Sequence, residues 1–409
     1  MTTPPTGSRA QHIHADYDAY VAPTYPASPV IFDRGEGSYV WDVDGRRYLD
    51  MGGGIAVNAL GHCPPEIQRA LAVQSARLIH CSNHYRHELQ ARLARKLVDL
   101  TGPGKVFFCN SGAEANEALF KLARRHGQAN GGQRYKIITT DLSFHGRTLA
   151  AIAATGQESI RAGFGPAMPG FTYVPFNDLE AARGAVDGET AAIMIEGIQG
   201  ESGILPASAD YLLGLRRLCD EHGILLLVDA VQCGMFRTGR FMSYQRVLEG
   251  VEGGEDFAPD AVSMAKSLGG GFPIGAAWFG EKVAGTLGPG THGTTFGGTP
   301  LACAVALAVI EAIEEKQLET HIREVGDLMA AELEKLAARD NHLQSVHGFG
   351  GMLGLQLDDR VNPTEMTAKA RENGLIIMPA GRGRVRLLPA LNVSRWEAEE
   401  ALGILAETL

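Results

Sequence analysis

The sequence predicts an α/β protein built around a mostly parallel sheet, and two observations carry this prediction. Short apolar strands alternate with helical stretches up to about residue 300, and glycine-rich or polar turns follow the strands. This alternation is typical of a parallel sheet with helices on both faces. Ligands of such sheets bind beyond the carboxyl ends of the strands. The expected strands are Lys105–Cys109, Tyr135–Thr140, Ala191–Ile195, Ile224–Val228, Ala261–Ala265 and Ala276–Phe279, and the expected helices include Glu114–His126 and Tyr211–His222.

Other patterns flank this region. Gly37–Asp50 predicts a hairpin around an Asp-Gly turn, and Pro64-Pro65 predicts a helix that runs through about Leu78. After about Leu301 a long helical stretch leads to further helices and short strands. We therefore expect an N-terminal arm and hairpin over residues 1–60 that belong to a small domain, a large ligand-binding domain over 61–300, and the rest of the small domain over 301–409.

Composition excludes several classes of protein. The 409 residues are 45% hydrophobic and 21% charged, which is typical of a globular chain, and the net charge of −10 argues against a nucleic-acid partner. The six cysteines include no CxxC pair, so they fit a reducing cytosol rather than disulfides or zinc. We see no signal peptide and no apolar run long enough to span a bilayer, and we expect a soluble cytoplasmic protein.

A lysine and an aspartate follow two of the expected strands. Lys266 comes directly after Ala261–Ala265 and precedes three glycines, and Asp229 comes directly after Ile224–Val228. They are 266 − 229 = 37 residues apart, about the length of one strand-crossover-strand unit. Both side chains are therefore expected at one edge of the sheet. A buried lysine there loses its proton easily and can act as an amine nucleophile, whereas a surface lysine in a loop is the simpler alternative.

The start of the helix after Lys105–Cys109 is a candidate anion site. Small residues, Gly112 and Ala113, leave free amides at the positive end of the helix dipole, where phosphate binds well. Ser111 followed three residues later by Glu114 is also a capping box, which needs no ligand.

Polar residues also follow other strands. Phe144 and Arg147 offer an aromatic face and a guanidinium to a planar or anionic ligand, or else a core side chain beside a surface arginine. Glu196 and Glu201 lie just after Ala191–Ile195, and a solvated loop would explain them equally well.

Two segments later in the chain add candidates. Thr294 and Thr295, in a glycine-rich loop, present hydroxyls that suit either phosphate or turn capping. Of the alternating arginines Arg384 and Arg386, we expect one to face inward and to need a carboxylate partner. The sequence has no GxxxxGK(S/T) loop, no GxGxxG that opens a helix after a strand, no HExxH or Cys/His cluster and no GxSxG, so ATP, NAD and metal sites and the commonest hydrolase signature lack support.

Taken together, these motifs resemble those of the class III pyridoxal-phosphate aminotransferases. The resemblance extends from Gly35 to Ser394, and within the class it is greatest to the acetylornithine and ornithine aminotransferases. One position departs from the family pattern, because Ala230 stands where glutamate usually follows the aspartate. The stretches that match in order and spacing are Asn110–Glu117, Phe144–Thr148, Asp229–Gln232, Ala265–Gly275 and Thr291–Gly298.

The resemblance implies fold type I of the pyridoxal-phosphate enzymes, with a large domain and a smaller α+β domain formed by both termini. Lys266 would bind the cofactor as a Schiff base and transfer protons, and Asp229 would pair with the pyridinium nitrogen. Gln232 would bond the ring oxygen, between Phe144 and Val231 on the two faces of the ring. The phosphate would be bound by Gly112 and Ala113, with Thr295 of the partner in a homodimer. The remaining cofactor contacts would be Ser111, His145 and Glu196.

The resemblance also implies the substrates. Arg386 would bind the α-carboxylate of glutamate or 2-oxoglutarate, and Glu201 would pair with it when that carboxylate is absent. Arg147, Thr294 and Tyr25 would contact or cover the amino donor. The expected reaction moves the terminal amine of N2-acetyl-L-ornithine to 2-oxoglutarate, a step of arginine biosynthesis. The alternatives are ornithine, succinylornithine or 4-aminobutyrate as donor, a pyridoxal-phosphate aminomutase, or a non-catalytic α/β binding protein.

Overall fold

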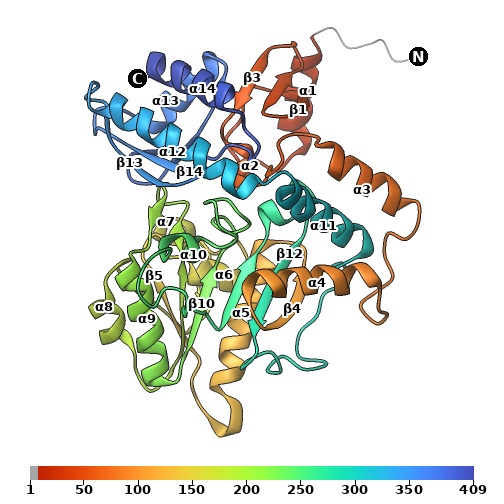
Figure 1. The fold of residues 1–409 in the computed structure, drawn as a ribbon, viewed down its shortest axis with the longest axis vertical. Coiled ribbons are helices and arrows are strands. Elements are labelled where there is room, and N and C mark those ends of the chain that lie inside the picture. Colours follow the sequence, from red (N-terminus) through yellow and green to blue (C-terminus); the bar gives the residue numbers. More distant parts are fainter. Residues whose placement is uncertain (1–7) are drawn as a thin grey trace.

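The computed structural model describes residues 8–409, and a seven-stranded sheet forms its centre (Figure 1). Only β12 runs antiparallel to its neighbours, so the expected mostly parallel α/β fold is confirmed. Near-continuous apolar runs form these strands because both faces of the sheet are covered. In spatial order the strands are β4 (Gly104–Cys109), β12 (Gly275–Gly280), β11 (Ala261–Met264), β10 (Leu225–Asp229), β7 (Thr190–Glu196), β5 (Lys136–Thr140) and β6 (Phe171–Val174).

The two faces of the sheet pack into two apolar cores. Successive residues of β10 alternate between them: Leu227 joins the core that contains α5, and Leu226 joins the core that contains α9. This burial on both sides holds the carboxyl end of β10 in place. The helices of this region are α4 (Glu88–Thr101), α5 (Gly112–Gly127), α6 (Leu149–Ala154), α7 (Glu158–Arg161), α8 (Leu179–Ala185), α9 (Ala209–His222) and α10 (Ser243–Val247).

Two details differ from the sequence-based expectation. The edge strand β6 was not expected, because it is only four residues long and mostly half-exposed, and so shows no continuous apolar run. The helix expected to reach Leu78 is α3 (Pro65–Ser75), and it ends earlier because the amides of Arg77 and Leu78 turn back onto the carbonyl of Gln74.

Both ends of the chain meet in the first of two smaller sheets. The predicted hairpin is present, and its strand β3 pairs with β15, more than three hundred residues later. We therefore propose the expected division, with the hairpin and residues 301–409 in one small domain. The first sheet has the order β1 (Phe32–Glu36), β2 (Tyr39–Asp42), β3 (Arg47–Asp50) and β15 (Leu375–Ile376), and the second has the order β13 (Leu343–Phe349), β14 (Met352–Leu357), β17 (Arg384–Leu387) and β16 (Met378–Ala380).

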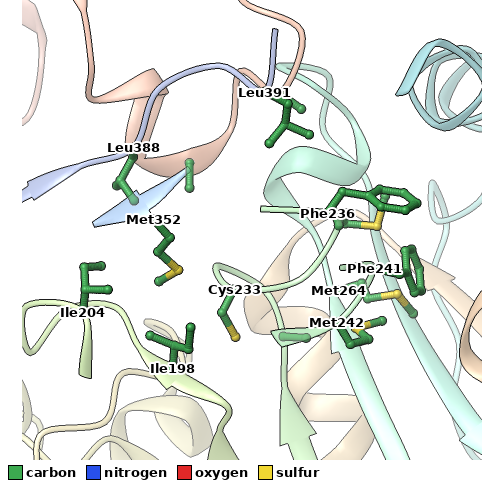
Figure 2. Packing of buried hydrophobic residues seen from close by; sticks show 14 of the residues in the cluster. Ile198, Ile204, Cys233, Phe236, Phe241, Met242, Met264, Met352, Leu388 and Leu391 are labelled. Atoms are coloured by element: carbon green, nitrogen blue, oxygen red, sulfur yellow. The ribbon is translucent and has the colours of Figure 1, made fainter. Parts of the chain in front are cut away.

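An apolar core continues from the large sheet into the C-terminal part (Figure 2). Cys233 and Phe236, which follow β10, lie on one side of it, and Met352 and Leu388 lie on the other. None of the helices within residues 8–409 is long and apolar enough to cross a membrane. The remaining elements are α1 (Arg9–Tyr20), α2 (Gly53–Ala56), α11 (Pro300–Glu315), α12 (Leu318–Ala337), α13 (Pro363–Glu372), α14 (Arg395–Thr408), the short 3-10 helices η1 (Ala129–Gly131) and η2 (Lys266–Leu268), and the two-stranded ribbon of β8 (Ile198–Gln199) and β9 (Leu205–Pro206).

The short turn α2 is left-handed. Its four residues have φ between 52° and 64°, and two of them, Ile55 and Ala56, are not glycine. Left-handed backbone costs roughly 1–2 kcal/mol for each such residue. The turn is held against the C-terminal part, because a Cβ added to Gly53 would lie 2.4 Å from the carbonyl oxygen of Leu388.

We predict that Gly53→Ala destabilises the protein by about 1–3 kcal/mol more than Gly37→Ala, as overpacking does elsewhere. Gly37 is the matched control, because its φ is 55° but an added Cβ would meet nothing within 4 Å. Urea unfolding of the two variants measures the difference. Equal losses would contradict the close contact between α2 and the C-terminal part.

Candidate active site

Three titratable residues meet at the carboxyl edge of the large sheet. Glu196 ends β7, Asp229 ends β10, and Lys266 comes two residues after the end of β11. The strands are parallel, and Asp229 is in register with both Glu196 and Ser263. The structure thus places Lys266 and Asp229 at one edge of the sheet, as the sequence predicts.

A cavity of about 410 Å³ opens at this edge. Its size lies in the range of small-molecule sites, roughly 300–1,000 Å³. Most of the expected cofactor residues line it, and so does one expected substrate residue, Arg147. The lining residues that the sequence predicts are Ser111, Gly112, Ala113, Phe144, His145, Arg147, Glu196, Asp229, Val231, Gln232 and Lys266.

Asp229 is buried and receives three hydrogen bonds. Its Oδ2 accepts bonds from Asn116 Nδ2 at 2.7 Å and pairs with His145 Nδ1 at 2.8 Å. Its Oδ1 accepts a bond from the amide of Val231 at 2.9 Å. The Asp229 side chain is only 3% exposed, and a buried acceptor without donors is costly. These three partners therefore satisfy the carboxylate and fix its orientation.

Asn116 is a functional residue to which the sequence reasoning gave no role. Its side chain also donates to the carbonyl of His145 at 2.8 Å, so Asn116 holds both Asp229 and His145, which itself pairs with Asp229. A signal was available, because Asn116 lies among buried apolar residues of α5. A polar side chain on such a face needs a hydrogen-bond partner.

The amine of Lys266 is suited to nucleophilic chemistry. Burial lowers its pKa to about 8, although the nearby carboxylate of Glu201 opposes this effect. A larger share of the amine is therefore neutral near neutral pH than for an ordinary lysine. The backbone of Lys266 is left-handed, with φ of 46°, which is uncommon for a residue with a side chain.

The first turn of α5 faces the cavity from the other side. Ser111 caps the helix by accepting a bond from the amide of Glu114, as expected. The second half of the predicted capping box is wrong: the Glu114 carboxylate accepts bonds from the amide and side chain of Asn110 instead of reaching Ser111. The first amides of an α-helix have no partner within it, and the first residues of this helix, Gly112 and Ala113, line one end of the cavity.

Phe144 and Glu196 form part of the cavity wall. The amides of Phe144 and Gly200 donate to the two carboxyl oxygens of Glu196, at 3.2 and 3.3 Å. Burial, with a further contribution from the charge of Asp229, raises the pKa of Glu196 well above its usual value. Arg147 is exposed and lies 5.7 Å from the centre of the Phe144 ring.

Arg386 is the inward-facing arginine of β17 and forms a two-pronged ion pair with Glu201. The distances are 2.7 Å from Nη1 to Oε1 and 3.2 Å from Nη2 to Oε2. Gln232, which lines the cavity, accepts a bond from Arg386 and donates one to Glu201. Burial would raise the pKa of Glu201, but the guanidinium outweighs burial and holds the pKa below its usual value.

Five expected substrate or cofactor residues do not line this cavity: Glu201 and Arg386, which pair beside it, and Tyr25, Thr294 and Thr295. Thr294 and Thr295 line a separate open cleft of about 800 Å³, although the Thr294 hydroxyl accepts a bond from Asn110 at the cavity. Tyr25 is 85% exposed, before β1. Contributions of Thr295 from a partner and of Tyr25 as a cover stay predictions. Ala230, which stands where the family usually has glutamate, is fully buried in an apolar core.

Comparison with known proteins agrees with this geometry. The family model described as "Aminotransferase class-III" matches residues 20–409. An acetylornithine aminotransferase of Caldanaerobacter subterraneus subsp. tengcongensis is 45% identical over 95% of this chain and 97% of its own length. A succinylornithine transaminase/acetylornithine aminotransferase of Pseudomonas aeruginosa is 43% identical over 96% of each chain. The structure is similar to the ornithine aminotransferase of Toxoplasma gondii, whose active site contains PLP at partial occupancy. The TM-score is 0.90 at 30% identity, over 97% of this chain and 94% of that one.

The cavity fits pyridoxal phosphate. The first turn of α5 provides amides for the phosphate, and Asp229 provides an acceptor for the ring nitrogen. A Cβ added to Gly112 would lie 2.6 Å from Val231 Cγ1, so a glycine keeps this end of the cavity open. Lys266 provides the amine that such a cofactor requires for covalent attachment.

We predict that capture of pyridoxal phosphate by the cofactor-free protein rises with pH around a midpoint near 8, because the neutral amine of Lys266 is the reacting form. Borohydride trapping at each pH, followed by mass spectrometry of the peptide that contains residue 266, measures the midpoint. Lys266→Ala is the control and should give no adduct at that position. A midpoint near the ordinary lysine value of about 10.4 would contradict the effect of burial.

Proposed function

We propose that this chain, which belongs to the class-III aminotransferases, transfers the terminal amine of N2-acetyl-L-ornithine to 2-oxoglutarate. The products would be N-acetyl-L-glutamate 5-semialdehyde and L-glutamate. As a pyridoxal-phosphate-dependent aminotransferase, the protein needs an amino donor and a keto-acid acceptor. The choice of donor is supported by relatives that carry this name at 43–46% identity over nearly the whole chain.

The observation that carries the proposal is the Arg386–Glu201 pair beside the cavity. A buried guanidinium without a counter-ion is costly. A donor that reacts at its terminal amine has no carboxylate on the reacting carbon, so Glu201 supplies the counter-ion while this donor is bound. We propose that 2-oxoglutarate replaces Glu201 with its own α-carboxylate. One site then accepts both the amine donor, which has no carboxylate on its reacting carbon, and 2-oxoglutarate, which has one.

The roles of the residues follow from their partners. When bound, pyridoxal phosphate withdraws electrons from the reacting carbon of the substrate. Asn116 and His145 hold Asp229 so that its carboxylate faces the cavity, where it keeps the proton on the ring nitrogen. Lys266, whose lowered pKa makes more of its amine available in the neutral form, accepts the proton that leaves the reacting carbon of the donor. Phe144 and Val231 enclose the cofactor and exclude water from its faces.

The far end of the donor is the part that distinguishes the candidate amines. Arg147 lies at the exposed rim of the cavity, where it suits the α-carboxylate of a donor that enters with its terminal amine first. Succinylornithine is the main alternative, because the Pseudomonas aeruginosa relative is named for both donors. Ornithine and 4-aminobutyrate remain further alternatives, and an aminomutase has no need for a site that binds 2-oxoglutarate.

We also propose a cytoplasmic homodimer. The hydroxyl of Thr295 lines a cleft outside the cavity of its own chain, so a role in phosphate binding requires the cavity of a second subunit. Cross-linking through cysteines introduced at position 295 and at the mouth of the partner's cavity would detect this arrangement.

Single-turnover assays of the holoenzyme test the proposed donor. N2-acetyl-L-ornithine, succinylornithine, ornithine and 4-aminobutyrate are compared by the rate at which each changes the cofactor absorbance, and 2-oxoglutarate then restores it. The acetylated donor is expected to react fastest. A faster reaction with another amine would assign the enzyme to that donor, and turnover without any keto acid would indicate a mutase.

We predict that Arg386→Ala weakens the half-reaction with 2-oxoglutarate by about 2–5 kcal/mol, the range for breaking a buried charge pair. Arg384→Ala is the matched control, because Arg384 lies two residues away on β17 and donates to the carbonyl of Ser202. The half-reaction with the amine should change much less. An unchanged KM for 2-oxoglutarate in Arg386→Ala would refute this role.

A further inference from the structure

The segment after β10 contains a buried arginine that the mechanism above does not use. Arg237 has 0% exposure and is among the largest fully buried side chains of the described residues. Burial lowers the pKa of its guanidinium to about 10, and its Nε has no hydrogen-bond partner within residues 8–409. A buried charge is normally paired with a carboxylate, and within the described residues Arg237 bonds only to neutral oxygens.

Those oxygens belong to separate parts of the fold. Nη1 donates to the carbonyls of Gly351 and Pro389, which flank β14 and β17 in the C-terminal part. Nη2 donates to the hydroxyl of Ser267 at 3.3 Å. Ser267 is the residue after Lys266, and Pro389 follows shortly after Arg386. Figure 2 shows the apolar side chains at this junction, with Phe236 on one side and Met352 and Leu388 on the other.

Ser267 connects two strained pieces of backbone. Its hydroxyl donates to the carbonyl of Ala56 at 2.8 Å, and Ala56 ends the left-handed turn α2. Lys266 is left-handed as well, with φ of 46°. Such conformations persist only where the surrounding structure holds them, and they are concentrated at functional sites. Ser267 and its donor Arg237 supply hydrogen bonds at the point where the two segments meet.

We propose that Arg237 is a positioning residue that fixes the lysine turn relative to the strand bearing Arg386. Through Ser267 it holds the backbone that carries the amine, and through Pro389 it holds the end of β17. The guanidinium presents five donors in a rigid planar fork, whereas a lysine has three donors on one nitrogen and an apolar side chain has none. The amine and the carboxylate-binding guanidinium therefore keep a constant separation. The part concerning Arg386 rests on the proposed function.

Three variants of the 409-residue chain test the link to Lys266 and the link to Arg386 separately. Arg237→Met removes the whole bridge, and Ser267→Ala removes the bonds that the hydroxyl makes to Arg237 and to the carbonyl of Ala56. Arg240→Met is the matched control, because Arg240 lies on the same segment but pairs with Glu249 and Glu319. The pH midpoint of borohydride trapping at Lys266 is measured on cofactor-free protein, and kcat and KM for 2-oxoglutarate are measured on the holoenzyme.

In Arg237→Met and Ser267→Ala, the trapping midpoint is expected to rise by about 0.5 pH unit or more, because a loosened lysine is better solvated. In Arg237→Met alone, KM for 2-oxoglutarate is expected to rise by about threefold or more with a smaller change in kcat. Arg240→Met should change neither quantity. If Arg237→Met does not fold, Arg237→Lys, which keeps the charge without the planar fork, takes its place.

An unchanged midpoint in Ser267→Ala would overturn the link to Lys266. An unchanged KM in the Arg237 variant, or equal changes in the Arg240 control, would overturn the link to Arg386. The trapping midpoint does not depend on which amine is the donor. A wrong assignment of the donor would therefore leave that measurement intact.

Discussion

The site depends on one buried carboxylate that stays in a fixed orientation. Asp229 ends a strand that is covered on both faces, and its oxygens accept bonds from α5, from the loop after β5 and from its own turn. Each donor comes from a different segment, so the orientation of the carboxylate depends on how α5 and the loops after β5 and β10 pack at the edge of the sheet. The price of burying the charge is offset by these bonds, and any unfilled acceptor would cost about 1–3 kcal/mol.

The other charges near the cavity are handled in different ways. Arg386 has a carboxylate partner that a substrate can replace, whereas Glu196 is so buried that its pKa is raised well above normal. Lys266 is kept partly neutral by burial. Arg237 has no carboxylate within ion-pairing distance in the part of the chain that is described, and it bonds to carbonyls and a hydroxyl instead. The ion pair of Arg386 can open to bind a substrate carboxylate. The guanidinium of Arg237, which is held by carbonyls and a hydroxyl, is suited to a structural role.

The assembly of the two ends of the chain is equally specific. Strand β3 of the N-terminal hairpin pairs with β15, and the left-handed turn α2 fits against the carbonyl of Leu388. Ala56, at the end of that turn, accepts the bond from Ser267 beside the lysine. The N-terminal and C-terminal segments therefore complete the surroundings of a lysine that belongs to the middle of the sequence.

The sequence by itself determined the central strands, the helix start at Ser111, and the placement of Asp229 and Lys266 at strand ends, because buried strands and helix caps leave local patterns in the chain. It missed the edge strand β6, whose half-exposed residues lack an apolar run. It assigned no role to Asn116 or Arg237. The resemblance had implied that Arg386 pairs with Glu201, but only the tertiary structure decided which donors reach Asp229 and that Arg237 bridges Ser267 and Pro389. Apart from the bond from Val231, these contacts join residues 30 to 152 positions apart that share no local pattern, so their partners are fixed only when the strands and loops pack together.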